Sequence, residues 1–432
     1  MNITGSYQNM FRIPELKRRL LFTAMILIVY RLGGHITTPG VDLDAIKQFF
    51  EGQQGTLVAL YDMFAGGNLS QATIFALGIM PYISASIILQ LLQAVIPYFE
   101  KLAKEGEEGR KKIQQYTRWG TLGLALVQSF GVSFTLERLG VVQDPGVGFK
   151  LVTMLTLTTG TMFVMWLGEQ ITERGIGNGI SLIIFTGIIA RYPTDILNTF
   201  QSLRDGRMHW LTGLIVAVLM IAVIAGIIAI TQGQRRIPVQ YAKKIVGRRV
   251  YGGANTHIPL RVNTAGVIPI IFAQSIIMFP GTLGSFFGEN AFIDTLTRIF
   301  QPPHIVYIVA YSALIILFTY FYTAVILNPV DLADNMKKNS GFIPGVRPGK
   351  KTAEYIDRVL TRVTLPGAFF LAAIAIMPDL MIAYFNVPFQ FGGTGLLIVI
   401  GVGLDTLQQI ESHLVMRHYD GFMSRGRLRS RR

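Results

Sequence analysis

The sequence predicts an all-α integral membrane protein with ten membrane-spanning helices. Of its 432 residues, 51% are hydrophobic and 15% are charged, whereas a soluble domain carries roughly 25% charged residues. The mean hydropathy is +0.45. Apolar runs of about 20 residues, the length of a helix that crosses the hydrocarbon layer, recur along the chain. A soluble core of this size could not hide so much apolar surface.

The apolar runs give the position of each expected span. The first run begins at Leu20 and is expected to be retained, because no small-residue cleavage site follows it. The fifth run is short, so that span is expected to start deeper in the bilayer or to be preceded by a turn that dips in. The ten spans are predicted at residues 20–36, 74–96, 118–136, 151–169, 179–191, 211–231, 264–280, 305–327, 363–380 and 394–411.

Positive charge predicts the orientation of the chain. With these spans, 31 of the 39 Lys and Arg residues fall on one side of the membrane, whereas Asp and Glu divide about evenly. Cytoplasmic loops carry this excess of Lys and Arg, so both termini are predicted to be cytoplasmic. Two long basic loops, residues 232–262 and 328–362, lie on the same side.

The two long loops are longer than topology requires, which favours a docking surface over simple lipid contact. The first alternates enough to predict a hairpin, with Gly247 near its turn. The second contains Gly341–Lys350, whose two Pro and three Gly disfavour regular structure and hold Arg347 on a stiff turn. The whole chain has a net charge of +14, and its basic residues lie in loops between the apolar spans, which favours anionic lipid, acidic proteins or RNA-rich partners.

Residues for catalysis are missing from the sequence. There is no cysteine, and the six histidines show no metal-binding spacing. We therefore expect no enzyme activity and no cofactor. Ionisable residues within the spans are scarce: Asp405 is a candidate relay, although a structural hydrogen bond is the favoured interpretation. A solute transporter with inverted repeats remains the alternative function, and a scaffold or receptor without a pore is a third.

Two apolar patterns allow either a special or an ordinary interpretation. Leu57–Gly67 is too short to cross a membrane, so it is either a re-entrant piece or, as its composition favours, an amphipathic helix on the outer surface. Ile79, Ile83 and Ile87 share one helical face, as do Ile180 and Ile184. Such a face could line a hydrophobic constriction, although isoleucine is common in any membrane helix.

Six longer segments, in matching order and spacing across nearly the whole chain, resemble the SecY family of bacterial protein-translocation channels. These segments are Ala76–Leu91, Thr172–Ser181, Gly233–Pro238, Gly247–Tyr251, Ala265–Pro269 and Gly345–Gly349. The resemblance implies a clamshell of two pseudo-symmetric five-helix halves around a central pore. The halves would be residues 1–195 and 196–413, followed by a basic cytoplasmic tail at 414–432.

The resemblance also implies roles for particular residues. The stretch at about 57–69, here called the plug segment, would block the external side of the pore, which reverses the preference for a surface helix. The residues assigned to the plug are Tyr61, Asp62, Met63, Phe64, Ala65, Gly66 and Gly67, those of the pore ring are Ile79, Ile83, Ile180, Ile184, Ile271 and Ile398, and those of the lateral gate are Ile87, Val267 and Gln274.

The family's function and partners follow from the same resemblance. The chain would translocate unfolded preproteins across the bacterial cytoplasmic (inner) membrane and release hydrophobic segments laterally into it, driven by the motor ATPase SecA or by the ribosome. SecE and SecG would be its membrane partners, and contact with lipids and ribosomal RNA is expected. The docking residues would be Arg235, Arg236, Arg248, Arg249, Arg347 and Lys350.

Overall fold

The structure, a computed structural model, is built mainly from helices. It describes residues 13–52, 57–206, 209–241, 244–246, 249–251, 255–287, 295, 299–302, 304–385 and 393–425. Within these ranges, six helices are long and apolar enough to cross a membrane, or seven if the bent pair α5 and α6 counts as one span. The protein is therefore a multi-pass helical membrane protein.

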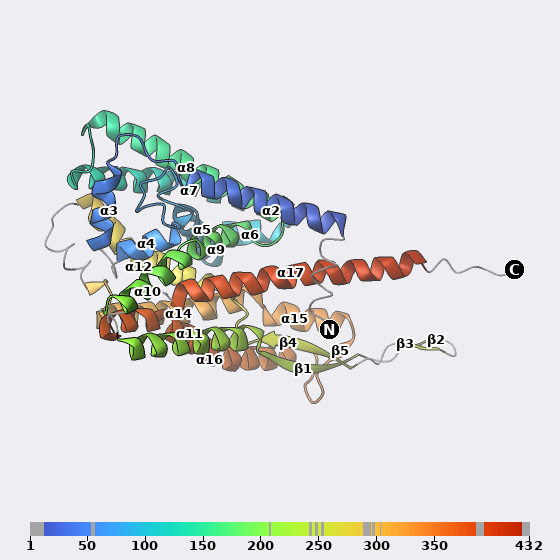
Figure 1. Cartoon of the computed structure of the whole chain (residues 1–432). Helices are drawn as coiled ribbons and strands as arrows, with labels where there is room; N and C mark the ends of the chain where they lie inside the picture. The colour runs from blue at the N-terminus through green and yellow to red at the C-terminus, as the bar shows by residue number, and fades with distance from the viewer. Residues whose placement is uncertain are drawn as a thin grey trace. The chain divides into compact units, whose positions relative to one another are not determined.

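One compact unit comprises Met1–Leu197, Met278–Arg298 and Ile398–Arg432. Helices α5, α7, α8 and α9 pack against one another in chain order, and α2 packs on α8 and α9 (Figure 1). The helices that lie in this unit are α2 (Pro14–Gly33), α3 (Leu43–Gly52), α4 (Leu57–Phe64), α5 (Met80–Val95), α6 (Pro97–Lys104), α7 (Glu107–Arg138), α8 (Val147–Arg174) and α9 (Gly179–Ile189).

Glycine lets the helices of this unit approach closely. A Cβ atom at Gly160 of α8 would collide with the carbonyl oxygen of Ile74, and one at Gly179 of α9 would collide with the carbonyl oxygen of Gly168. Membrane helices have no hydrophobic drive to associate within lipid, so close packing at small residues holds them together. These contacts fix α8 between the start of α9 and the segment before α5.

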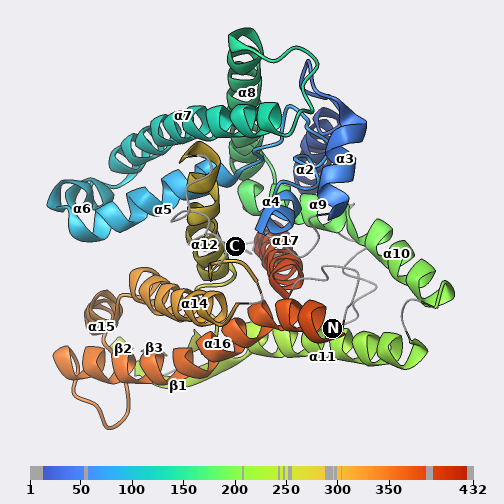
Figure 2. The ribbon, with the colours of Figure 1, turned by 90° about the vertical axis from the view of Figure 1, so that its left-hand side faces the viewer.

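Prolines set both ends of α5. Pro81 lies in its first turn, where a missing N–H removes no helical hydrogen bond, and Pro97 follows its end. The residue before a proline avoids helical angles, and Ile96 is extended at φ −100° and ψ 119°. The chain bends by 99° there into α6, a turn visible in Figure 2.

The other unit comprises Asn198–Ile277 and Ile299–Leu397. Its strands β1 and β4 pair antiparallel from Gln234↔Arg261 to Gln240↔Asn255, and β5 adds to β1 at Gln240↔Phe342. Figure 1 shows β2 and β3 beyond the ends of β1 and β4. The elements that lie wholly in this unit are α11 (Trp210–Gln232), β1 (Gln234–Tyr241), β2 (Lys244–Val246), β3 (Arg249–Tyr251), β4 (Asn255–Arg261), α14 (Ile305–Ile326), α15 (Pro329–Lys338), β5 (Gly341–Phe342) and α16 (Lys350–Phe385).

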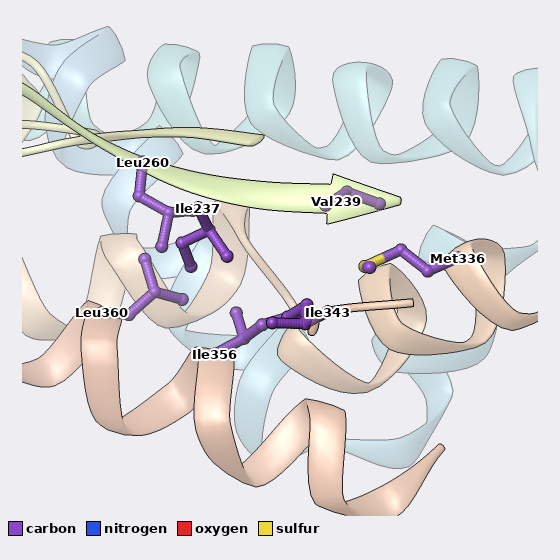
Figure 3. Packing of buried hydrophobic residues seen from close by; sticks show 7 residues of the cluster. All are labelled: Ile237, Val239, Leu260, Met336, Ile343, Ile356 and Leu360. Atoms are coloured by element: carbon purple, nitrogen blue, oxygen red, sulfur yellow. The ribbon is translucent and has the colours of Figure 1, made fainter. Parts of the chain in front are cut away.

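A hydrophobic cluster joins the sheet of this unit to α15 and α16 (Figure 3). Burial alternates along β1, so Ile237 and Val239 face inward while their neighbours are exposed. These side chains meet those of α15, α16 and the chain after β5. The buried members of the cluster are Ile237, Val239, Leu260, Met336, Ile343, Ile356 and Leu360.

Three helices span the two units: α10 (Tyr192–Arg204), α12 (Ile268–Phe287) and α17 (Gly393–Arg425). Each of the ten predicted spans overlaps a helix. The short fifth span is extended, because α9 and α10 together form one candidate span of 26 residues, Gly179–Arg204.

The predicted hairpin in the first long loop is confirmed, since β2 pairs with β3 at Val246↔Arg249. Gly247 itself lies outside the described residues. The five strands are a departure from an all-α fold. Strand β1 forms because its alternating apolar residues, Ile237 and Val239, can be buried on one face.

The hydrophobic cluster that packs against the sheet should contribute to the stability of this unit. Ile356→Ala removes a fully buried side chain, and a cavity of this kind costs about 2–5 kcal/mol. We expect trypsin to cleave the detergent-purified protein faster at Arg235 and Arg236 of β1, which are exposed. Val330→Ala, at a side chain that is 56% exposed on α15, serves as the control. Equal cleavage of the two variants would contradict the assigned packing.

Candidate functional site

The end of the plug segment, from Asp62 to Gly66, is buried in the first unit. Helix α4 ends at Phe64, and Met63, Phe64 and Ala65 are all at most 4% exposed. Gly66 and Gly67 follow with φ of +75° and +81°, a left-handed conformation that glycine adopts without steric cost. The described side chains at the end of α4 are therefore covered by the chain itself, which disagrees with an exposed surface helix at these positions.

Asp62 organises the turn that ends the segment. Its Oδ1 accepts hydrogen bonds from the backbone N–H groups of Leu69 at 3.0 Å and Ser70 at 2.9 Å. The N–H of Gly67 donates to the Asp62 carbonyl at 2.8 Å. A buried carboxylate is tolerated only when it is hydrogen-bonded or paired. These hydrogen bonds lie within the turn, so the turn would keep its shape if the whole segment moved.

The segment is seated by backbone contact with α9 and with the start of α5. A Cβ atom on Gly66 would lie 2.9 Å from Cα of Gly187 in α9, and one on Gly78 would lie 3.1 Å from Cα of Ala65. Figures 1 and 2 both show α4 beside α9. Tyr61 donates from its hydroxyl to the carbonyl oxygen of Leu77 at 3.3 Å. The segment therefore rests immediately beside Ile79, where α5 begins.

Helix α2 supports the segment from another direction. The Tyr30 hydroxyl donates to the carbonyl oxygen of Ala65 at 3.4 Å, and Asn68 donates to the Tyr30 hydroxyl at 3.3 Å. Arg31 Nη1 donates to the carbonyl oxygen of Gly66 at 3.4 Å. These long hydrogen bonds satisfy the carbonyl groups of the turn without adding a rigid link.

The residues assigned to the pore ring are described and mostly buried. Ile79 and Ile83 lie one turn apart at the start of α5, and Ile184 lies on α9. Ile180 is partly buried and faces α8, because a Cβ atom at Gly168 would meet its side chain. Ile271 of α12 and Ile398 of α17 are also buried. The structure thus brings Ile79 and the plug segment together, and the closed ring of six stays a prediction.

The residues assigned to the lateral gate lie in different units. Ile87 is buried on α5, and Val267 precedes α12. Gln274 is buried on α12, and within the described residues its Nε2 has no hydrogen-bond partner. An unsatisfied buried amide costs free energy, so this position favours any arrangement that offers it an acceptor.

The two basic loops form one body. Pairing of β5 with β1 and the cluster of Figure 3 join them, so Arg235 and Arg236 of β1 and the turn at Arg347 belong to the same packed body. Arg347 and Lys350 are exposed, and the Thr352 hydroxyl donates to the Arg347 carbonyl at 2.9 Å. Arg249 lies on β3. Arg248 lies outside the described residues.

Sequence reasoning missed two ion pairs. Arg118 of α7 contacts both carboxylate oxygens of the buried Glu169 on α8, at 3.0 and 2.7 Å, and Gln114 donates to the same carboxylate at 3.0 Å. Arg191, after α9, contacts Asp62 at 2.9 Å. The partners are 51 and 129 residues apart, and no local pattern in the sequence signals either pair.

These features define a class: a multi-pass helical membrane protein with a short apolar helix whose end is buried beside its spans, and with a basic, sheet-bearing body built from the loops that follow α11 and α14. The family model described as SecY matches residues 73–407. The protein translocase subunit SecY of Escherichia coli (strain K12) is 50% identical over 424 residues, which cover 96% of each chain. The chain belongs to the SecY family.

Solved structures agree on the fold. A structure described as showing that the SecY plug domain stabilises the closed state of the translocation channel and maintains a membrane seal matches with a TM-score of 0.66 at 18% identity, over 92% of each chain. Sec61 in the canine ribosome–channel complex from the endoplasmic reticulum matches with a TM-score of 0.63 at 17% identity, over 94% of this chain and 96% of that one.

The contact between Gly66 and Gly187 predicts which substitution will displace the plug segment. Gly187→Val would place methyl groups where Gly66 now lies, so the segment must move away. The chain has no cysteine, so Met63→Cys can report on this movement through labelling by a water-soluble maleimide. We expect slow labelling in the Met63→Cys parent and fast labelling once Gly187→Val is added. The control adds Gly123→Ala, in open space on α7, to the Met63→Cys parent. Equal labelling of the parent, the Gly187→Val variant and this control would contradict the contact between Gly66 and Gly187.

Proposed function

We propose that this chain is the channel subunit of a bacterial Sec translocase and conducts unfolded preproteins through the cytoplasmic membrane. Membership of the SecY family, with a short apolar helix whose buried end lies beside Ile79, carries the proposal. The chain itself performs no catalysis. SecA or the ribosome supplies the driving force, and SecE and SecG accompany the channel in the membrane.

The proposed architecture has ten spans in two five-helix halves, residues 1–195 and 196–413, with both termini in the cytoplasm. The 414–432 tail is basic. A waist of isoleucines suits a channel for unfolded chains, because it offers no polar ligand to which a passing side chain could adhere. An apolar constriction also excludes water and ions while it is closed. The plug segment adds a second seal next to the waist.

Lateral release follows from partition between the pore and lipid. Each CH2 group of a hydrophobic segment gains about 0.8 kcal/mol on leaving water, whereas a Lys or Asp at the centre of the bilayer costs about 2.5–3.5 kcal/mol. Ile87 lies on α5, Gln274 lies on α12, and Val267 immediately precedes α12. An opening between these two helices would let this free-energy difference sort segments either into lipid or across the membrane. Among the described residues the Gln274 Nε2 has no hydrogen-bond partner, which supports a role at such an opening.

Reconstitution tests the function directly. Proteoliposomes that contain the chain with SecE and SecG should protect a preprotein from added protease when SecA and ATP are supplied. Vesicles with an inhibitor of ATP hydrolysis or without the chain should leave it degraded. Protection that is equally complete without the chain, or none in the full system, would overturn the proposal.

The basic body predicts an effect of charge on docking. Arg347→Glu reverses an exposed charge on the turn fixed by Thr352, where an arginine can bind carboxylate or phosphate groups through two hydrogen bonds. We expect SecA-driven translocation to slow by about tenfold, equivalent to about 1.4 kcal/mol, while the protein still inserts and folds. The control is Lys47→Glu, an exposed cation on α3 at the predicted external side. A full-rate Arg347→Glu channel would remove this residue from the docking surface.

A further inference from the structure

The base of the β-sheet touches the backbone of α16 at one glycine. Pro366 and Gly367 stand side by side within the membrane-spanning part of this helix. Proline lacks the N–H group of a helical hydrogen bond, and glycine lacks a side chain. A Cβ atom on Gly367 would lie 2.9 Å from the carbonyl oxygen of Val262 and 3.1 Å from its Cγ1 atom. Val262 therefore occupies the place that a side chain at position 367 would fill.

Val262 also closes the base of the sheet. It directly follows β4, and its N–H donates to the carbonyl oxygen of Gly233 at 2.9 Å, next to the pair Gln234↔Arg261. Gly233 in turn ends α11, because its N–H donates to the carbonyl oxygen of Ala229 at 2.9 Å. The base of the sheet is thus held by close backbone contacts to both α11 and α16.

The rest of the sheet lies on the same side of α16. Ile356 and Leu360 contribute to the hydrophobic cluster of Figure 3, and with Gly367 they recur at whole turns of a helix that has about 3.6 residues per turn. Helix α14 packs closely on α16, and the Tyr320 hydroxyl donates to the carbonyl oxygen of Thr361 at 3.3 Å. Helix α16 is therefore a long, braced support, and the sheet is seated along it as far as Gly367.

The chain beyond Val262 leads directly into α12, and we call residues Val262–Val267 the coupling turn. Gly266 has a φ of +65°, which glycine adopts without steric cost, and α12 begins at Ile268. The side chains of Ala265 and Val267 are 2% and 6% exposed. Because packed interiors have few voids and transmit displacement, a short and buried turn of this kind passes a movement of the sheet on to α12.

We propose that Gly367 is a positioning residue of the channel: its contact with Val262 is the pivot about which the basic body tilts when a partner binds, so that the coupling turn moves the start of α12. This inference rests on the proposed channel function. Arg235 and Arg236 are exposed charges for such a partner, and they lie on β1 close to the base of the sheet. No side chain cushions the pivot, so a tilt reaches the helix that carries Ile271 of the proposed pore ring.

A side chain at position 367 should separate docking from translocation. Gly367→Ala and Gly367→Val push on a backbone carbonyl, which cannot turn aside as the end of a side chain can, so the base of the sheet must leave α16. The exposed arginines remain, so SecA should still dock. In reconstituted vesicles the SecA concentration for half-maximal translocation should change by less than about twofold, whereas the maximal rate should fall about threefold in Gly367→Ala and about tenfold in Gly367→Val.

The substitutions are chosen to exclude a merely structural role. Alanine favours a helix more than glycine does, so Gly367→Ala strengthens α16 itself, and a weakened helix cannot explain a slower rate. Ala373→Val, at an exposed position of the same helix, is the control and should keep the parent rate.

Labelling of Val267→Cys follows the coupling turn without any translocation. The chain has no cysteine, and this buried position can only become more exposed when the start of α12 moves. With a non-hydrolysable ATP analogue, SecA should therefore raise the rate of labelling by a water-soluble maleimide in the parent complex. In the Gly367→Val complex, SecA should bind with the same affinity but leave the labelling rate unchanged.

The pivot is overturned by weaker SecA binding in either Gly367 variant, by equal SecA-dependent labelling in the parent and Gly367→Val, or by an equal loss of rate in Ala373→Val. If Gly367→Val does not fold, Gly367→Ala decides with the same readouts. If the parent complex moves no preprotein at all, the channel proposal fails, while SecA-dependent labelling still decides the pivot.

Discussion

The close approach of two glycines, Gly66 and Gly187, is the constraint on which the rest of the site depends. Backbone meets backbone there, and a Cβ atom on either residue would lie 2.9 Å from the other's Cα atom. Because no side chain intervenes, the turn that ends α4 can enter among the spans and bring Ala65 against Gly78, next to Ile79. The segment proposed as the plug therefore lies next to Ile79, a residue of the proposed waist.

The contacts that hold the segment combine shape with charge. The close approach of Gly66 and Gly187 supplies complementary shape but little specificity for one position along α9. The hydrogen bonds of Asp62 add that specificity, because they fix the turn internally and link it to Arg191. In this ion pair the Asp62 side chain is buried, whereas the Arg191 side chain is partly exposed.

Hydropathy predicted much of the fold because a bilayer constrains helices by length. Each predicted span overlaps a helix, and alternation of apolar residues predicted the hairpin that begins with β1. The pairing of β5 with β1 could not be predicted, since a two-residue strand some 100 residues away carries no periodicity. The same holds for Asp62 with Arg191 and for Arg118 with Glu169, which only the packed helices bring together. Composition favoured a surface position for Leu57–Gly67 because it reports the apolar character of a segment and is silent on whether protein or lipid covers it.

The central claim is that an extended polypeptide passes the isoleucines of the waist. A preprotein stalled halfway through the reconstituted channel, with a photo-cross-linking residue placed at Ile79 or Ile271 in turn, tests it most directly. The account predicts adducts from both positions and none from Leu155, which is 71% exposed on the outer face of α8. Adducts from Leu155 alone, or none from Ile79 and Ile271, would contradict it.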